Sequence, residues 1–437
     1  MKKGILLFIA LFGIGAGLLA QSWTALNAGL LKTAVNIEKI SIVDKNVVWC
    51  VAGSNSPTHE FAVSTDGGLT FKKGTVKGMG TKQYFSDIAA ISDKVAYVSV
   101  YSNPAAPGGV YKTVDGGATW TQSGAGSIFF DFNSFPNALH FWDENNGMAF
   151  GDPTSNNDNS NEIYTTTDGG TTWTQTPAAN IPANDLPENG TYYNYNPLVV
   201  VGSTVWYPTV NGYLYRSDNR GLNWRRTKID TTATIASLSF LEDKMTGIAV
   251  TSQAVPYKTT DGGETWNQLS ASANGPFPSI IAIPGTNIFV TASSTGTVKS
   301  AYSLDKGNTW ISIDETNQYY GLAFKDMNTG YAGGNPKTTG GLYKWNPGIL
   351  DVKDNTTLSK CQLYPNPVSG KLIIDLSKTE FSAANITLSN VQGQILKTIN
   401  CSNNISEMEI NEPAGMYFIT VKSAEEQFTK RIVVKNN

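Results

Sequence analysis

The stretch Thr166-Thr-Asp-Gly-Gly-Thr-Thr-Trp173 decides the fold, because it recurs at regular intervals along the chain. The other copies are Ser64–Phe71, Thr113–Trp120, Ser217–Trp224, Thr259–Trp266 and Ser303–Trp310. Their aspartate position falls at Asp66, Asp115, Asp168, Asn219, Asp261 and Asp305, at intervals of 49, 53, 51, 42 and 44 residues. A period of this length fits one four-stranded blade of a β-propeller.

Each residue type in the repeat has a mechanical reason. An aspartate in a tight turn accepts hydrogen bonds from nearby backbone N–H groups, and the glycine after it takes the positive φ that a hairpin turn needs. The closing aromatic residue packs between neighbouring sheets and is Trp120, Trp173, Trp224, Trp266 or Trp310 in five copies. Asn219 and Lys306 depart from the pattern without disrupting the turn. The repeat resembles the Asp-box (BNR-like) repeat of sialidase, xyloglucanase and photosystem II assembly factor propellers.

Seven units are present although only six carry a box. The seventh ends at Leu342-Tyr-Lys-Trp345 with no box after it, while Ser22-Trp-Thr-Ala-Leu26 resembles the strand that follows each box. We therefore predict an all-β fold in which a seven-bladed β-propeller is closed by the N-terminal strand and followed by a small β-sandwich. Closure removes the free edges that an open sheet would expose. The charged fraction of 15 % and the 42 glycines suit short strands and tight turns.

The two ends of the chain predict its processing and division into domains. Lys2 and Lys3, the apolar run that follows and Ala20 form the pattern of a cleaved signal peptide over 1–20, which we favour over a membrane anchor. The propeller is expected over 21–346, a polar linker over 347–360 and a β-sandwich of short strands over 361–437.

The last domain resembles the type A sorting domain of the type IX secretion system. The resemblance rests on Leu363-Tyr-Pro-Asn-Pro-Val368, Gly393, Ala414–Val421 and the basic, apolar end Lys430–Lys435. It implies that residues 361–437 engage the type IX secretion machinery, and that the protein passes through the periplasm to the outer cell surface or the medium. The mature chain would have no transmembrane span, and whether it is released or anchored stays open.

Charge and composition exclude several classes of site. The formal net charge is −3, or −5 without Lys2 and Lys3, and there is no basic stripe for nucleic acid. His59 and His140 stand alone, so no metal site or catalytic triad is expected. We expect no cofactor; the 152–162 loop, Asp152 to Glu162, has oxygen ligands for Ca²⁺ but lacks the EF-hand spacing, which favours a solvated loop.

The three cysteines form no metal-binding motif. Cys50 lies in an apolar stretch and is expected to be a buried small hydrophobe. Cys361 and Cys401 could pair in an oxidising compartment, and the sequence leaves that open.

Two of the related propeller classes fit poorly. Sialidases hold a carboxylate with three arginines from separate blades, whereas Arg216, Arg220, Arg225 and Arg226 all lie in one turn and its flanks. The resemblance to photosystem II assembly factors implies a non-enzymatic helper that binds a protein client, but this chain is poor in the arginines that such factors use.

The remaining choice is between hydrolysis and binding. Paired carboxylates of a polysaccharide hydrolase would come from Asp131, Asp143 and Asp152, with Asp87 further away, although a turn or strand-end acceptor is the favoured interpretation of each. Aromatic residues precede several innermost strands, and we select Tyr84, Phe130, Tyr193 and Tyr320 as candidate ligand-binding residues; packing between blades explains them equally simply. We interpret the protein as a secreted or surface propeller that binds a glycan or an extracellular protein, with a glycoside hydrolase as the alternative.

Overall fold

The computed structural model describes residues 22–26, 36–53, 58–102, 107–154, 161–183, 198–229, 233–270, 275, 279–334, 341–347, 361–377, 384–390, 394–401, 403–423 and 427–435. One compact unit covers Gln21–Pro347 and a second contains Gly348–Asn437. The predicted signal peptide, and residues 348–360 of the predicted linker, lie outside the described residues.

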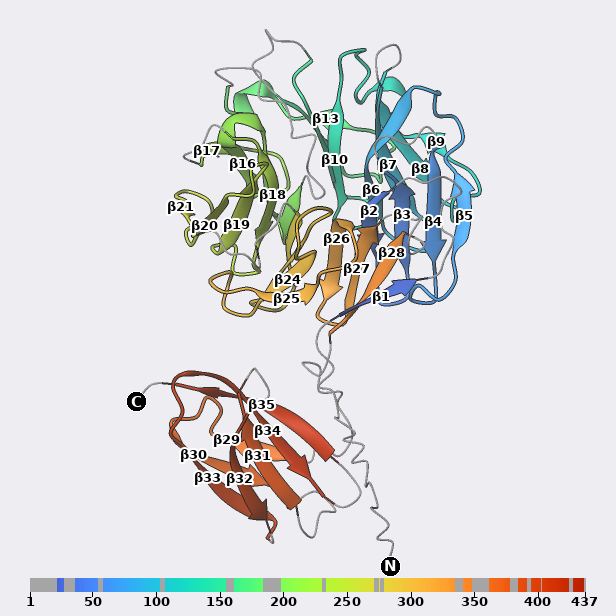
Figure 1. Ribbon diagram of the computed structural model, residues 1–437. Helices are drawn as coiled ribbons and strands as arrows, with labels where there is room; N and C mark the ends of the chain where they lie inside the picture. The colour runs from blue at the N-terminus through green and yellow to red at the C-terminus, as the bar shows by residue number, and fades with distance from the viewer. Residues whose placement is uncertain are drawn as a thin grey trace, which may run out of the picture. The chain divides into compact units, whose positions relative to one another are not determined.

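The first unit consists of seven four-stranded antiparallel sheets arranged around a common axis (Figure 1). The first three sheets are β2 (Ile37–Ile42), β3 (Val48–Ala52), β4 (Glu60–Ser64), β5 (Lys72–Thr75); β6 (Gln83–Ala90), β7 (Ala96–Ser102), β8 (Gly109–Thr113), β9 (Thr121–Gln122); and β10 (Pro136–Phe141), β11 (Gly147–Gly151), β12 (Glu162–Thr166), β13 (Thr174–Gln175). The next three are β14 (Val199–Val201), β15 (Thr204–Pro208), β16 (Tyr213–Ser217), β17 (Arg225–Lys228); β18 (Ile235–Phe240), β19 (Gly247–Thr251), β20 (Pro256–Thr259), β21 (Asn267–Gln268); and β22 (Ser279–Ala282), β23 (Phe289–Ala292), β24 (Ser300–Ser303), β25 (Ile311–Asp314). The short 3₁₀ helices η1 (Ser123–Gly126), η2 (Ala178–Asn180) and η3 (Val210–Gly212) lie in connections, and no helix of the described residues is long and apolar enough to cross a membrane.

The seventh sheet joins the two ends of the propeller. It contains β26 (Tyr319–Asp326), β27 (Thr329–Gly334), β28 (Leu342–Asn346) and, as its outermost strand, β1 (Ser22–Leu26). β1 pairs antiparallel with β28, with Trp23 opposite Trp345. The seven-bladed propeller closed by the N-terminal strand is therefore confirmed.

The box turns have the geometry that their residue types predict. In the first box, Asp66 Oδ1 accepts the Thr70 N–H at 2.9 Å, and the Ser64 hydroxyl donates to the same carboxylate at 2.8 Å. Asn219 replaces the aspartate in the fourth box and its Oδ1 still accepts the Asn223 N–H at 3.0 Å. Arg220 and Lys306 stand where other boxes have glycine, and both take the same positive φ, 59°.

The boxes lie at one end of the propeller, together with the turns between the first and second strands. Gly67 N donates to Asn46 O at 2.8 Å, and Gly169 N donates to Asn145 O at 2.9 Å, so a box and the neighbouring turn are hydrogen-bonded. We call this end the box face. The innermost strands begin at the opposite end, which we call the loop face.

The second unit is a β-sandwich with its own core. One sheet has the order β29 (Gln362–Tyr364), β30 (Gly370–Asp375), β33 (Ile405–Ile410), and the other β32 (Ile395–Cys401), β31 (Ala384–Ser389), β34 (Gly415–Lys422), β35 (Gln427–Val434). Alternate residues of both sheets, such as Leu372 and Ile374 on β30 and Ile386 and Leu388 on β31, fill the space between them. Cys361 and Cys401 belong to this core as free thiols.

Candidate functional site

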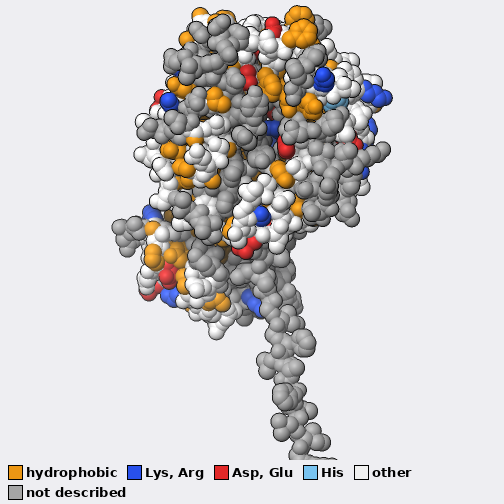
Figure 2. Space-filling view, turned by 45° about the horizontal axis from the view of Figure 1, so that its top comes forward, with side chains coloured by type: hydrophobic (Ala, Val, Ile, Leu, Met, Phe, Trp, Pro, Cys, Tyr) orange, Lys and Arg blue, Asp and Glu red, His pale blue; other side chains and the backbone are white. Residues whose placement is uncertain are grey.

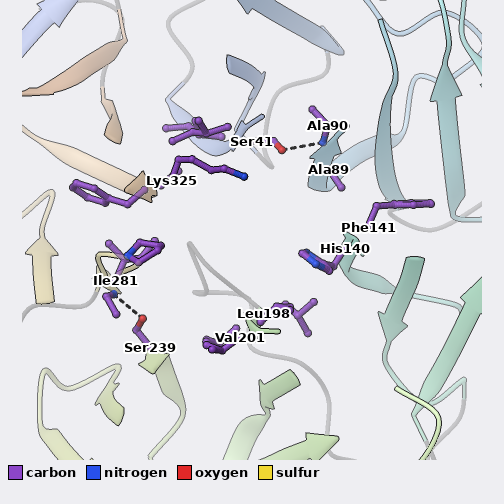
Figure 3. A pocket seen from close by; sticks show the side chains of 18 of the residues that line it. Ser41, Ala89, Ala90, His140, Phe141, Leu198, Val201, Ser239, Ile281 and Lys325 are labelled. Atoms are coloured by element: carbon purple, nitrogen blue, oxygen red, sulfur yellow. Dashed lines mark hydrogen bonds between the residues drawn. The ribbon is translucent and has the colours of Figure 1, made fainter. Parts of the chain in front are cut away.

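The innermost strands of the seven blades surround an axial pocket of about 570 Å³. Its wall is made of the last residues of these strands and the residues after them, so the pocket lies toward the box face. Most of the wall is aliphatic, as at Leu198, Val201 and Ile281, while His140 and Lys325 are polar (Figure 3). The propeller is also visibly hollowed near its middle in the space-filling view (Figure 2).

Side chains of one blade satisfy the free backbone edge of the next. The innermost strand of a blade is an edge strand, and its N–H groups on that edge lack partners within their own sheet. Hydroxyl oxygens of the preceding blade accept three of them, and Figure 3 marks two: Ser41 Oγ from Ala90 N at 2.9 Å, Ser239 Oγ from Ala282 N at 2.8 Å and Ser237 Oγ from Ile280 N at 3.0 Å. These serines are therefore part of the wall and are not free nucleophiles.

Asp87 links three blades at the same level. Its Oδ2 accepts the N–H of Leu139 from the third blade at 3.0 Å, and its Oδ1 accepts the N–H of Ile88 at 2.9 Å. Lys39, buried in β2 of the first blade, interacts electrostatically with this carboxylate. Burial raises the pKa of Asp87 against the opposing charge of Lys39, and burial lowers the pKa of Lys39. The carboxylate is already occupied by backbone donors, which makes it an architectural group.

The other three candidate carboxylates do not all lie on one face of the propeller. Asp143 follows the end of β10 on the box face, whereas Asp152 accepts a hydrogen bond from Asn137 Nδ2 at 2.6 Å near the beginning of that strand. A strand of six residues is roughly 20 Å long, so Asp143 cannot face Asp152 across one cleft. Asp131 lies on the loop face in the turn before β10, and its Oδ1 accepts the Asn133 N–H at 2.8 Å.

Asp143 is held by its own turn. Its Oδ1 accepts the backbone N–H groups of Asn146 at 2.8 Å and Asn145 at 2.9 Å, and both carboxylate oxygens accept from Asn146 Nδ2 at 2.9 Å. These hydrogen bonds lower the pKa of Asp143. A carboxylate stabilised in its charged form is a poor general acid at neutral pH.

Several aromatic side chains lie on the loop face of the second and third blades. The ring of Tyr101 lies 5.6 Å from that of Tyr84 and 4.4 Å from that of Phe135, with the latter pair stacked. In the turn before β10, Phe130 is 69 % exposed and Phe132 is 70 % exposed. We call these five residues the aromatic patch.

The turn that carries the exposed rings is anchored by Phe129. This residue is fully buried, takes a φ of 52° and packs edge-to-face on Tyr164 at 5.1 Å. A positive φ is unfavourable for a bulky residue such as Phe129. The next residue, Phe130, points outward. The structure thus places two of the predicted ligand-binding residues, Tyr84 and Phe130, in neighbouring blades.

The remaining candidates lie elsewhere. Tyr320 is half-buried on β26 of the seventh blade, and Tyr193 lies outside the described residues. Residues 155–160 of the candidate calcium loop also lie outside them. Among the residues that the structure describes, no cluster of three or more His, Cys, Asp or Glu side chains has the arrangement of a metal site.

Sequence reasoning missed the residues that line the pocket near the third blade. His140 is isolated from other candidate metal or catalytic residues in the sequence, yet its ring lies 4.9 Å from that of Trp142 in the pocket wall. Burial and the neighbouring Arg220 lower the pKa of His140 to about 4, so its imidazole is neutral at pH 7. The signal in the sequence was a polar residue inside an apolar innermost strand, which also marks Lys39.

Solved structures resemble the propeller at the level of fold. The structure of "YCF48 bound to D1 peptide" has a TM-score of 0.53 and 18 % sequence identity, and the match covers 74 % of this chain and 96 % of that one. YCF48 from Cyanidioschyzon merolae gives a TM-score of 0.51 and 16 % identity, covering 75 % and 99 %. A search of curated proteins by sequence found no significant match.

The C-terminal unit is recognised by sequence. Residues 362–435 match the family described as "Secretion system C-terminal sorting domain", which confirms the resemblance inferred from the motifs at the end of the chain. Such a domain links its chain to the type IX secretion machinery and indicates export to the cell surface or the extracellular space. The protein is thus a seven-bladed β-propeller that carries a secretion system C-terminal sorting domain.

Proposed function

We propose that this protein binds an extracellular polysaccharide without cleaving it, and that the aromatic patch on the loop face is its contact surface. The observation that carries the proposal is the exposure of Phe130 and Phe132, at 69 % and 70 %, on the same face as the stacked rings of Tyr101 and Phe135. Phenylalanine rings this exposed are unfavourable in water unless a ligand covers them. Flat rings stack on the apolar faces of sugars, and a row of them follows an extended polymer.

The arrangement of the carboxylates supports binding over hydrolysis. Retaining or inverting glycosidases need two carboxyl groups that flank one bond, at separations of about 5 to 9.5 Å. Asp143 is on the box face, Asp87 is occupied by two backbone N–H groups, and Asp152 is buried and bonded to Asn137. A secreted binding protein also fits the export that the sorting domain indicates.

A protein segment is the second candidate ligand, since one of the similar structures, YCF48, was solved with a bound peptide. Aromatic rings on a rigid scaffold also serve as anchors for peptides. The two ligand classes differ in one respect that an experiment can use: a polysaccharide binds by repeated weak stacking along its length, whereas a peptide binds with a defined sequence.

The test compares the mature chain with a Phe130→Ala/Phe132→Ala variant in affinity electrophoresis against plant and microbial polysaccharides. We expect retention of the parent chain by at least one polymer and a loss of about tenfold or more in the variant, because stacking is worth about 1 kcal/mol or more per ring. The matched control is Leu69→Ala/Leu222→Ala, which removes two exposed apolar side chains from the box face.

Equal retention of the parent chain and the patch variant would contradict the proposal. New reducing ends that disappear in an Asp152→Asn variant would support the hydrolase alternative instead. Retention by no polysaccharide, with capture of a defined peptide from a display library that depends on Phe130 and Phe132, would support the peptide alternative.

A further inference from the structure

A second cluster lies on the box face, at the opposite end of β10 from the aromatic patch. Trp142 follows β10, lines the axial pocket and is half-buried. Its Nε1 donates to the carbonyl of Gly202 from the fourth blade at 2.7 Å. This bond fixes the indole at the boundary between the third and fourth blades, in the wall of the pocket.

Two cations flank this indole. The guanidinium of Arg220 lies over the Trp142 ring at 5.2 Å from its centroid. Lys244 lies beside the glycine whose carbonyl accepts this hydrogen bond, because a Cβ built on Gly202 would be 3.4 Å from Lys244 Nζ. Arg220 is exposed and Lys244 is half-buried, and both have a positive φ, 59° for Arg220 and 58° for Lys244.

Neither cation has an acidic partner within the described ranges. The carboxylate of Asp143 interacts electrostatically with Arg220. Its two oxygens also accept hydrogen bonds from the backbone and side chain of its own turn. Glu242 also lines the pocket and is exposed to solvent. Among the described residues no ion pair holds Arg220 or Lys244, so both can contact an external anion.

The wider sector is positive in a chain that is negative overall. Residues 198–229, which form the fourth blade, contain five basic side chains and one acidic side chain, Asp218, whereas the whole chain has a formal net charge of −3. A local positive field raises the concentration of anionic ligands at this sector and repels other cations. On the side of the fourth blade this charge favours an anion over a neutral ligand, whereas Asp143 and Glu242 line the pocket on the other blades.

We propose that Trp142, Arg220 and Lys244, here called the Trp142 site, bind an acidic saccharide. The sugar ring packs against the half-buried indole at the pocket, and its carboxylate or sulfate lies between the guanidinium and the ammonium group. Such a ligand needs two elements: an aromatic contact with its ring, and charge-assisted hydrogen bonds to its anionic substituent. A sugar is favoured over an acidic peptide because the site is a ring platform at a concave pocket and not an extended groove.

The test measures binding by tryptophan fluorescence and calorimetry with four probes of similar length: a polygalacturonate oligomer, a sulfated oligosaccharide, a neutral glucose oligomer and polyglutamate. We expect the mature chain to bind one of the two acidic saccharides at least tenfold more tightly than the neutral oligomer and polyglutamate. The acidic saccharide that binds more tightly shows whether the ligand carries a carboxylate or a sulfate.

Three variants locate the site. Arg220→Asn and Lys244→Asn each remove one charge, and asparagine tolerates the positive φ at both positions. Each should weaken binding about tenfold, because each removes a charge-assisted hydrogen bond to the anion. Lys228→Gln removes the same charge from β17 of the same blade, away from Trp142, and should change the affinity less than twofold.

Several results would overturn the proposal. An equal loss in all three variants would show that the field of the blade, and not a built site, attracts the ligand. Tighter binding of polyglutamate would identify an acidic protein segment as the ligand, and failure to bind either acidic saccharide would remove the site altogether. The Phe130→Ala/Phe132→Ala variant should bind the acidic probe normally, so failure of this site and failure of the aromatic patch are measured separately.

Discussion

Trp23 Nε1 donates a hydrogen bond to Ser300 Oγ at 3.0 Å, which joins residues 277 positions apart in the chain. The same indole contacts the rings of Trp345 at 5.0 Å and Tyr319 at 5.6 Å. One residue of the N-terminal strand β1 thus completes the seventh blade and connects it to the sixth. The stability of the whole ring depends on this closure, because it pairs the exposed edge of β28.

We predict that Trp23→Ala lowers the free energy of unfolding by about 3 kcal/mol, the low end for removal of a packed aromatic because Trp23 is half-buried. Urea denaturation of the protein, monitored through the unfolding transition of the propeller, measures this loss. Thr24→Ala on the same strand is the control, since Thr24 is exposed and should change the free energy by less than about 0.5 kcal/mol. Equal effects of the two substitutions would show that β1 contributes nothing specific.

The seventh and first blades approach each other closely through glycine. A Cβ on Gly333 would lie 2.0 Å from Ile37 O, so Gly333→Ala forces backbone apart at the closure and should cost about 3 kcal/mol or more. Gly80→Ala is the matched control, because a Cβ there meets only the Gln83 side chain, at 3.8 Å. Thermal unfolding of both variants decides the point; a stable Gly333→Ala protein would mean that the blades are not in contact at this position.

Asp87 should be more costly to remove than an exposed carboxylate. Asp87→Ala leaves the N–H of Leu139 without its acceptor and removes the opposing charge of Asp87 from the buried Lys39, and loss of one member of a buried pair costs about 3–5 kcal/mol. A double-mutant cycle with Lys39→Met measures the coupling of the two residues. We expect the double variant to be more stable than the sum of the single losses; strict additivity would show that the two charges do not interact.

Acid should destabilise the propeller below pH 4. The hydroxyl and backbone hydrogen bonds of the box turns lower the pKa of Asp66, Asp115 and Asp168 to about 2, whereas an unfolded aspartate titrates near pH 3.9. A depressed folded pKa contributes stability above the unfolded value, and that stability is lost as the pH falls toward 2.

The melting temperature measured between pH 2 and pH 6 tests this. A variant with asparagine at Asp66, Asp115 and Asp168 should depend less on pH across that window, because Asn219 shows that an amide supports the same turn. An unchanged pH profile in that variant would assign acid sensitivity to other groups. His140, with its pKa lowered to about 4, adds a separate loss of stability between pH 6.5 and pH 4.

The cysteines should be inert in the folded protein. Burial raises the pKa of Cys50 to about 12 and that of Cys361 to about 11, and Cys401 is buried in the same core as Cys361. We predict no reaction with a thiol reagent under native conditions and three reactive thiols in denaturant. One reactive thiol in denaturant would instead reveal a Cys361–Cys401 disulfide in the exported protein.

The sequence determined the architecture because its repeat is local. Each box is a turn of eight residues in which the aspartate and glycine act on their near neighbours, so its spacing alone predicts the blades. The role of Ser22–Leu26 also followed from the sequence, because its Trp-Thr pattern matches the strands after the boxes. The sorting domain was predictable for the same reason, from short motifs in a fixed order.

Only the tertiary structure decided which side chains share a surface. Asp143 and Asp152 are nine residues apart, yet the two ends of β10 separate them, while Trp142, Arg220 and Lys244 are distant in sequence and meet at one blade boundary. The acceptor role of Asp87 likewise depends on the N–H of Leu139, which belongs to another blade. Contacts between blades form when the ring closes, so no local pattern in the sequence predicts them.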